Sequence, residues 1–157
     1  MSFRVGIGID AHAFADGAPL VLGGVRFDSP RGLAGHSDGD VITHALIDAL
    51  LGAAGLGDIG SLFPSNDSTP EGVSSLDLLR ETLGRVTSAG YHVVNADCVL
   101  IGEQPRIALR RGKLEHTLTE IVGAPVSVRA TTTDKLGFTG RGEGLAAQAV
   151  ALLGRSD

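Results

Sequence analysis

The sequence predicts an α+β fold in which helices pack on one face of a mixed β-sheet. Apolar runs of strand length alternate along the chain with longer segments whose apolar residues recur at the spacing of one helix face. The 157 residues are 43% hydrophobic and 20% charged, an ordinary balance for a globular chain. We therefore expect one domain over residues 1–157 with a sizeable hydrophobic core.

The expected strands are short and mostly apolar. They are Phe3–Ile9, a short strand or hairpin over Leu20–Phe27 with Gly23 and Gly24 as a turn or bulge, Val93–Ile101 and Val126–Thr133. The expected helices show helical spacing between capping residues, with Ser37 or Asp38 capping the first of them. They are Val41–Leu56, Ser74–Ala89, Arg106–Val122 and a short terminal helix at Gly144–Leu153. The polar stretch 57–72 is expected to be a loop.

Composition and charge exclude several classes of function. The formal net charge is −5 and the isoelectric point is about 5.4, so a surface that binds nucleic acid is not expected. No apolar run approaches the ~20 residues of a membrane span, and the chain starts on a strand pattern instead of a secretory signal. Cys98 is the single cysteine, which suits a reducing compartment. We therefore expect a cytoplasmic protein without nucleic-acid or membrane partners.

Acidic and histidine side chains occupy positions from which they can share a metal ion. Asp10 and His12 follow the first strand two residues apart, and in an extended chain such residues point the same way. Asp40, His44 and Asp48 form one column on the first helix, because residues four apart lie above one another. If this helix packs beside the first strand, His44 completes a three-ligand site with an open position, which is typical of catalytic zinc. A solvated polar column is the alternative, and the spacing alone leaves both interpretations open.

Two glycine-containing loops hold groups suited to phosphate and to hard cations. The segment GHSDGD, residues 35–40, places His36 and Ser37 before a helix start whose N–H groups can bind an anion, or it is simply a well-capped start. The segment TTTDKLGFTGRGEG, residues 131–144, presents threonine hydroxyls at a strand end, followed by Asp134, a candidate magnesium ligand. Threonine runs are also good strand formers. Neither segment is a P-loop or a dinucleotide-binding fingerprint.

Taken together, these segments resemble one enzyme family, the 2-C-methyl-D-erythritol 2,4-cyclodiphosphate synthases of the non-mevalonate isoprenoid pathway. The resemblance rests on GIDAHAF, LGG, GHSDGDVITHALIDALLGAAGLGDIGSLFP and ATTTDKLGFTGRGEG, which lie in the family's order over nearly the whole chain. It implies a lyase that converts a nucleotide substrate, 4-diphosphocytidyl-2-C-methyl-D-erythritol 2-phosphate, to the cyclic diphosphate. The 2-phosphate attacks the β-phosphate and CMP leaves, so positioning and charge neutralisation carry the chemistry.

The resemblance also implies two metal sites. By position, Asp10, His12 and His44 match ligands of zinc or another divalent transition metal, which acts as Lewis acid and template. Asp48 stands where it can orient an imidazole or a bound water from outside that set. Asp134 matches a ligand of magnesium or manganese held together with the substrate diphosphate.

The remaining site residues are carried over by position. His36, Asp48 and Thr132 correspond to catalytic residues, residues 58–67 to a methylerythritol pocket and residues 102–108 to a cytidine pocket. The residues that the resemblance implies for substrate binding are Asp10, His12, His36, Ser37, Asp58, Ile59, Gly60, Phe63, Asp67, Gly102, Pro105, Arg106, Ile107, Ala108, Thr131, Thr132, Thr133, Phe138 and Arg141.

Three positions depart from the family's common pattern. Asp134 stands where relatives often have Glu, so its shorter side chain must reach the second ion through a water molecule or a loop shift. Ser65 replaces an Asp that often follows the Phe-Pro pair, and Arg106 replaces a common Lys, which keeps the charge but changes its geometry. The three zinc positions are unaffected.

The family assembles as a cyclic homotrimer, and the resemblance implies the same assembly here. Each site then lies at a subunit interface, with the zinc residues from one subunit and the nucleotide and second-metal segments from its neighbour. A central cavity near Phe138, Arg141 and Glu143 is a candidate site for an isoprenoid diphosphate.

Two rival functions share some of these features. A metal-dependent phosphohydrolase would use the same Asp and His ligands with water as the nucleophile. A trimeric binding protein would hold an isoprenoid diphosphate beside a purely structural metal. Neither rival explains the pyrimidine-pocket segment and the metal segment together.

Overall fold

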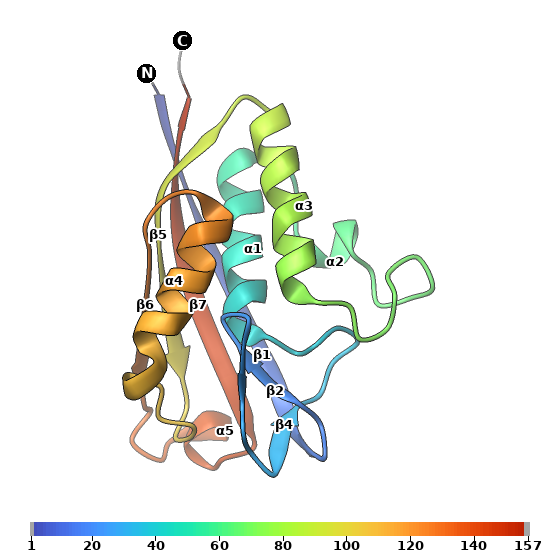
Figure 1. Ribbon diagram of the computed structural model, residues 1–157, viewed down its shortest axis with the longest axis vertical. Coiled ribbons are helices and arrows are strands. Elements are labelled where there is room, and N and C mark those ends of the chain that lie inside the picture. Colours follow the sequence, from blue (N-terminus) through green and yellow to red (C-terminus); the bar gives the residue numbers. More distant parts are fainter. Residues whose placement is uncertain (1, 156–157) are drawn as a thin grey trace.

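The computed structural model describes residues 2–155 and has a five-stranded sheet with helices on one side (Figure 1). Its strands are β1 (Ser2–Asp16), β4 (Arg31–Leu33), β5 (His92–Ile101), β6 (Val126–Thr131) and β7 (Gly144–Arg155), in the order β4-β1-β7-β5-β6. β5 and β6 run parallel and the other neighbouring pairs run antiparallel, which confirms the mixed sheet. β2 (Leu20–Leu22) and β3 (Val25–Phe27) form a separate hairpin, the second of the two alternatives expected for Leu20–Phe27.

The helices lie together over one face of this sheet (Figure 1). They are α1 (Val41–Ala54), α2 (Ile59–Leu62), α3 (Ser75–Ser88), α4 (Arg111–Val122) and α5 (Gly137–Gly140), with a 3-10 turn at Ala108–Arg110. α1 packs on β1 and β7, and α3 packs on α1. The predicted α+β class is therefore confirmed. A membrane crossing needs a longer apolar helix than any that residues 2–155 form.

Two glycines of β1 let α1 lie unusually close to the sheet. A Cβ atom on Gly6 would overlap the backbone oxygen of Ala49, and one on Gly8 would overlap the oxygen of Ala45. Only glycine permits this approach, since any side chain would push the helix backbone away from the strand. The close packing brings the α1 residues that follow its first turn directly above the residues that follow Gly8 in β1.

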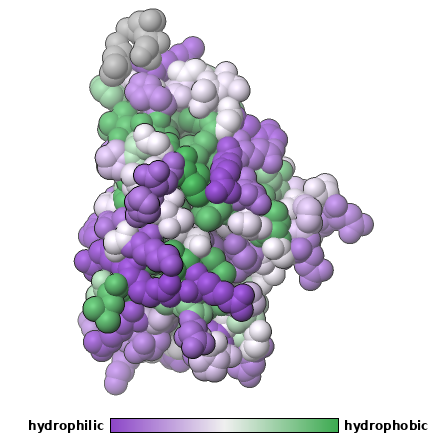
Figure 2. Space-filling model, in the orientation of Figure 1, coloured by the Kyte–Doolittle hydropathy of each residue, from purple (hydrophilic) through white to green (hydrophobic). Residues whose placement is uncertain are grey.

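The opposite face of the sheet exposes apolar side chains. Phe3, Val5, Ile7 and Ile9 alternate along β1 and are 57%, 69%, 59% and 65% exposed. Hydrophilic residues, by contrast, cover much of the helix-bearing side (Figure 2). Since monomeric proteins rarely leave a contiguous apolar strip in water, this face has the character of an association surface.

The predicted terminal helix at Gly144–Leu153 is wrong, because this segment is the long strand β7 between β1 and β5. Its alanines favour a helix in isolation, which explains the error. In the fold they alternate: Ala147, Ala149 and Ala151 are buried beneath α1, whereas Gln148 and Val150 face the other side. Packing against a close helix selects small residues in a strand, and this overrides local propensity.

The ends of several elements also differ from the prediction. β1 continues to Asp16, so Asp10 and His12 lie inside the strand and not beyond its end. β6 stops at Thr131, and α4 begins only at Arg111, so residues 106–107 belong to a loop. The expected loop 57–72 contains the short helix α2.

The N-cap of α1 is Asp40, not Ser37 or Asp38. Asp40 is fully buried and accepts hydrogen bonds from the N–H groups of Gly23 (2.9 Å), Gly24 (2.7 Å) and Thr43 (3.1 Å). It therefore anchors the β2–β3 hairpin to α1 and does not belong to a solvated column with His44. Burial raises the pKa of Asp40, although these donors oppose the shift.

Candidate functional site

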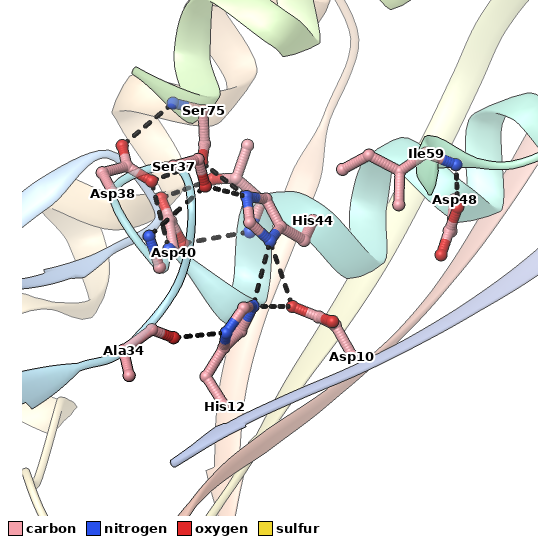
Figure 3. Close-up of polar contacts among 12 residues, drawn as sticks. Asp10, His12, Ala34, Ser37, Asp38, Asp40, His44, Asp48, Ile59 and Ser75 are labelled. Atoms are coloured by element: carbon pink, nitrogen blue, oxygen red, sulfur yellow. Dashed lines mark hydrogen bonds and ion pairs between the residues drawn. The ribbon is translucent and has the colours of Figure 1, made fainter. Parts of the chain in front are cut away.

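Asp10, His12 and His44 come together at the junction of β1 and α1 (Figure 3). Asp10 and His12 point to the same side of β1, and α1 brings His44 over them because Gly6 and Gly8 allow the close packing. Asp10 Oδ2 lies 2.8 Å from His12 Nε2 and 3.1 Å from His44 Nδ1, and the two nitrogens are 3.3 Å apart. The sequence prediction that the helix completes this set is thereby supported geometrically.

This triangle has the size that a tetrahedral metal site requires. Ligand atoms bound at about 2.0 Å to one tetrahedral ion are separated by about 3.3 Å, close to the separations seen here. Two imidazole nitrogens and one carboxylate oxygen are ligands that zinc and similar divalent ions accept. The triad therefore fits a divalent metal ion with a fourth position open toward the adjoining cleft.

Hydrogen bonding prepares His12 for this role. Its Nδ1 lies 2.6 Å from the carbonyl oxygen of Ala34, which can only accept, so Nδ1 carries the hydrogen and donates it. The Nε2 lone pair of a neutral His12 then faces Asp10 and His44, where a metal would bind. Ala34 was not part of the predicted site, and no sequence signal marks a backbone carbonyl for this task.

The triad attracts positive charge. Burial disfavours an ionised Asp10, yet its close contacts with the imidazoles of His12 and His44 hold its pKa below the ordinary value. The hydrogen bond to Asp10 raises the pKa of His12 against the opposing effect of burial. In the metal-free protein a proton on His12 therefore competes with a divalent ion for the same position.

A cavity of about 180 Å³ opens beside the triad. Its walls contain the three metal-site residues together with His36, Ser37, Ile59, Gly60, Phe63, Ser65, Thr69 and Leu78. The structure thus brings several residues predicted for phosphate and methylerythritol binding to one place. Thr69 and Leu78 were missed, because one lies in a loop without a motif and the other reads as an ordinary core residue of α3.

His36 is held at the cavity wall by the loop that precedes α3. Its Nε2 donates to the carbonyl oxygen of Thr69 at 2.6 Å, which leaves Nδ1 as the acceptor nitrogen of the neutral ring. Ser37 lies next to it, with its Oγ 2.9 Å from His44 Nε2. Ser37 is therefore directly connected to the metal triad, whereas His36 is bonded to the loop.

Three predicted aspartates take different positions around α2. Asp48 accepts the N–H of Ile59 at 2.8 Å, so it fixes the start of α2 and is not bonded to an imidazole; burial raises its pKa. Asp58 is exposed and caps α2 through the N–H of Ser61 at 2.8 Å, a bond that lowers its pKa. Asp67 is exposed and does not line the cavity.

The predicted nucleotide residues line a different cavity, of about 400 Å³. Its walls are Gly102, Glu103, Gln104, Pro105, Arg106, Ile107, Ala108, Arg111, Ala130, Thr131 and Thr132. The β5 and β6 ends bring the segments 102–108 and 131–132 together because the two strands are parallel neighbours. The two cavities share no lining residue.

The segment after β6 is a tight turn tied to the loop after β5. Asp134 and Lys135 have φ angles of 51° and 67°, the left-handed conformation that side chains disfavour. The N–H of Lys135 donates to Glu103 Oε1 at 3.1 Å, and the hydroxyl of Thr133 donates to the carbonyl of Leu136 at 2.6 Å. Thr133 therefore maintains the turn. The carboxylate of the exposed Asp134 accepts a hydrogen bond from the Thr132 hydroxyl at 3.3 Å.

Phe138 and Arg141 lie in and after α5, away from both cavities. Phe138 is 43% exposed, and Arg141 pairs with Glu143 at 3.0 Å, which raises the pKa of the guanidinium.

Together, the fold and the triad define an α+β protein with a site for a divalent metal ion beside a cleft. The YgbB family model matches residues 3–154. A relative from Rubrobacter xylanophilus, named 2-C-methyl-D-erythritol 2,4-cyclodiphosphate synthase, is 56% identical over 160 residues, which cover 98% of this chain and 96% of the relative.

Solved structures give the same result. IspF of Plasmodium falciparum, solved as a CDP complex, has a TM-score of 0.85 at 30% identity, with 99% of this chain and 98% of that chain covered. Bifunctional IspDF from Campylobacter jejuni has a TM-score of 0.94 at 37% identity, and the match covers 99% of this chain but only 43% of that protein. The chain therefore belongs to the YgbB family, and the family resemblance drawn from its motifs is confirmed.

Proposed function

We propose that this chain converts 4-diphosphocytidyl-2-C-methyl-D-erythritol 2-phosphate to 2-C-methyl-D-erythritol 2,4-cyclodiphosphate with release of CMP. It acts as a cyclising phosphorus–oxygen lyase, the activity for which its relatives are named. The observation that carries the proposal is that the metal triad shares one cavity with His36, Ser37 and the α2 residues predicted for the methylerythritol unit.

The residues of this cavity have distinct tasks in the proposed reaction. A zinc or similar divalent ion bound by Asp10, His12 and His44 supplies charge neutralisation and a template for phosphate oxygens. His36 and Ser37 hold the phosphate beside the triad, and residues 59–63, with the Phe63 ring, enclose the methylerythritol chain. Positioning is sufficient for catalysis because the attacking and the attacked phosphate belong to one molecule.

The second cavity supplies the nucleotide half of the proposed site. Residues 102–108 surround the cytosine with backbone groups and the buried Ile107, while Arg106 reaches outward to the phosphate or ribose. Thr131 and Thr132 donate hydroxyl hydrogens to the diphosphate. Asp134 would hold a magnesium or manganese ion, which would neutralise charge on the substrate diphosphate.

A cyclic homotrimer would join the two halves. The separation of the two cavities within one chain, and the exposed apolar strip of β1, support this assembly. In such a trimer the apolar strips would meet around the axis, and a central cavity near Phe138 and Arg141 would accept an isoprenoid diphosphate. Native mass spectrometry measures the assembly, and an Ile7→Glu variant should shift it to the monomer.

Phosphorus NMR of the purified protein with its substrate, zinc and magnesium tests the function directly. Signals of a cyclic diphosphate and one equivalent of CMP are expected. A phosphohydrolase would instead give an open diphosphate or monophosphate, and a binding protein would leave the substrate unchanged. Either of those outcomes contradicts the proposal.

A further inference from the structure

The Nε2 side of His44 faces a network that none of the predicted site residues except Ser37 belongs to (Figure 3). Ser75, the first residue of α3, places its Oγ 2.8 Å from His44 Nε2, and Ser37 Oγ lies 2.9 Å from the same nitrogen. Ser75 is fully buried and His44 is only 7% exposed, so water has little access to replace these contacts. The nitrogen opposite the metal position is thus held entirely by hydroxyl groups.

Asp38 determines the donor and the acceptor of the hydrogen bond between Ser75 and His44. Its carboxylate forms a short hydrogen bond with Ser75 Oγ and also accepts the N–H of Ser75 at 2.9 Å. A carboxylate has no hydrogen to donate, so the hydroxyl hydrogen of Ser75 is directed to Asp38. The Ser75 oxygen can then only accept from His44, and Nε2 must carry the hydrogen.

We propose that Asp38 and Ser75 are positioning residues that hold His44 with its Nδ1 lone pair directed at the metal position. The inference rests on the metal site proposed above. With Nε2–H donated to Ser75, the unprotonated Nδ1 faces Asp10 Oδ2 at 3.1 Å and His12 Nε2 at 3.3 Å. In the other tautomer, Nδ1–H would bond to Asp10 and block the position of the ion.

The two histidines of the triad are therefore oriented by different means. His12 donates to a backbone carbonyl, that of Ala34, which no substitution at Ala34 removes. His44 depends on a side chain whose direction is set by a second side chain. Groups behind a metal ligand typically change metal affinity by about 10- to 100-fold when they are removed.

Ser37 cannot perform the same selection. Within residues 2–155 its Oγ meets His44 Nε2 and the N–H of Gly39, and neither contact fixes its hydroxyl hydrogen. It can donate to His44 in one tautomer and accept from it in the other. Ser75 differs because Asp38 takes its hydrogen.

Asp38 also has a structural task, since it accepts the first N–H of α3. The test must therefore separate metal positioning from helix capping. Ser75→Ala does so, because it removes the hydroxyl and keeps the backbone N–H that Asp38 accepts. Asp38→Asn is the second variant, since its amide has only one acceptor oxygen for the three hydrogens that the carboxylate accepts, from the Ser75 hydroxyl and from the N–H groups of Ser75 and Asp40. Thr82→Val is the matched control, because it removes a buried α3 hydroxyl that bonds only to the carbonyl of Leu78 at 2.9 Å.

The measurement is the zinc dissociation constant of metal-free protein, obtained by competition with a chelating dye, together with the melting temperature of the metal-free form. Ser75→Ala should bind zinc about 10- to 100-fold more weakly, and Asp38→Asn at least as weakly, whereas Thr82→Val should match the parent. Melting temperatures of Ser75→Ala and Thr82→Val should be similar. In the zinc-loaded parent, nitrogen–proton NMR should show a protonated His44 Nε2 that exchanges slowly, and this exchange should accelerate in Ser75→Ala.

An affinity of Ser75→Ala within about twofold of the parent would overturn the positioning role while leaving the metal site intact. A loss of affinity equal to that of Thr82→Val would also overturn it, because the effect would then be structural. A parent protein that binds no zinc at the triad would contradict the metal site itself, and the positioning role with it.

Discussion

The metal cavity and the nucleotide cavity of this chain are built in opposite ways. The metal triad comes from the long strand β1 and a buried helix, and each of its histidines has partners on both ring nitrogens. The nucleotide side is formed by loops after β5 and β6, where Thr131, Thr132 and Asp134 are all exposed. The three residues of the metal triad all come from one chain. The loops after β5 and β6 instead leave their polar groups exposed.

This difference separates a site that is held by packed secondary structure from one that is held by loops. Metal ligands must be correct to a few tenths of an ångström, and a packed helix–strand contact provides that. Loops can order when substrate and a neighbouring subunit arrive, and segments of low local stability commonly serve binding. Here the left-handed residues Asp134 and Lys135, each costing on the order of 1 kcal/mol, are held by the contact with Glu103.

His44→Ala should give the largest effect, because it removes a ligand from the rigid half. Zinc content should fall to near zero and turnover by about 1,000-fold or more, since charge neutralisation at the phosphate is lost. Circular dichroism should show the parent fold, as Ser75 retains its bonds to Asp38. His116→Ala, on the exposed side of α4, is the control for losing a histidine. Normal zinc content in His44→Ala would show that the triad is not the metal site.

Mixing two inactive variants tests whether the halves come from different subunits. His12→Ala damages the metal half, and a Thr132→Ala/Asp134→Ala double variant damages the nucleotide half. If sites form between subunits of a cyclic trimer, co-refolding at equal amounts should restore about one-quarter of the sites. Native mass spectrometry must confirm the mixed trimers. Mixed trimers that stay as inactive as their parents would place both halves of each site in one subunit.

Asp134→Ala should separate the two metals. The variant should keep its zinc but need about tenfold more magnesium for half-maximal turnover, because the second ion is held mostly by substrate oxygens. Magnesium titrations at constant zinc measure this, with Asp28→Ala as an exposed-carboxylate control. An unchanged magnesium requirement, or loss of zinc, would contradict the assignment of Asp134.

Glu103→Ala should give the smallest effect, confined to the loops after β5 and β6. Without the 3.1 Å contact to the Lys135 N–H, the turn that carries Asp134 should loosen and raise KM by about 3- to 10-fold, with a smaller change in kcat. Glu103→Gln retains an acceptor oxygen and should restore most of the difference. A change in zinc content would show that the metal cavity and the nucleotide cavity are coupled within one chain, and would contradict their separation.

The sequence revealed the parts of the molecule that carry regular patterns. Alternating and helical spacing located β1, α1, α3 and β5, and the motifs indicated Asp10, His12 and His44. β7 was misjudged because its alanines satisfy a helix equally well, and only the close approach of α1 makes a strand of small residues favourable.

The supporting contacts of the site were beyond sequence reasoning for a different physical reason. Ala34 acts through a backbone carbonyl, and Ser75 acts through a hydroxyl that also suits the first turn of any helix. Asp40 appeared to share a face with His44, yet its hydrogen bonds to Gly23 and Gly24 turn it into the core. Such roles depend on which loop folds over which helix, and spacing along one element carries no information about that.

The absence of side chains at Gly6 and Gly8 has a consequence for two walls of the cavity beside the metal triad. α1 is one continuous helix. His44 lies near its beginning, and Asp48, which accepts the N–H of Ile59, lies one turn further along. A single methyl group added at Gly8 would overlap the backbone of α1 and push the helix away from β1. The metal triad and the α2 wall of the adjoining cavity would then move together, so the spacing of the three ligand atoms and the shape of this cavity depend on the same two glycines.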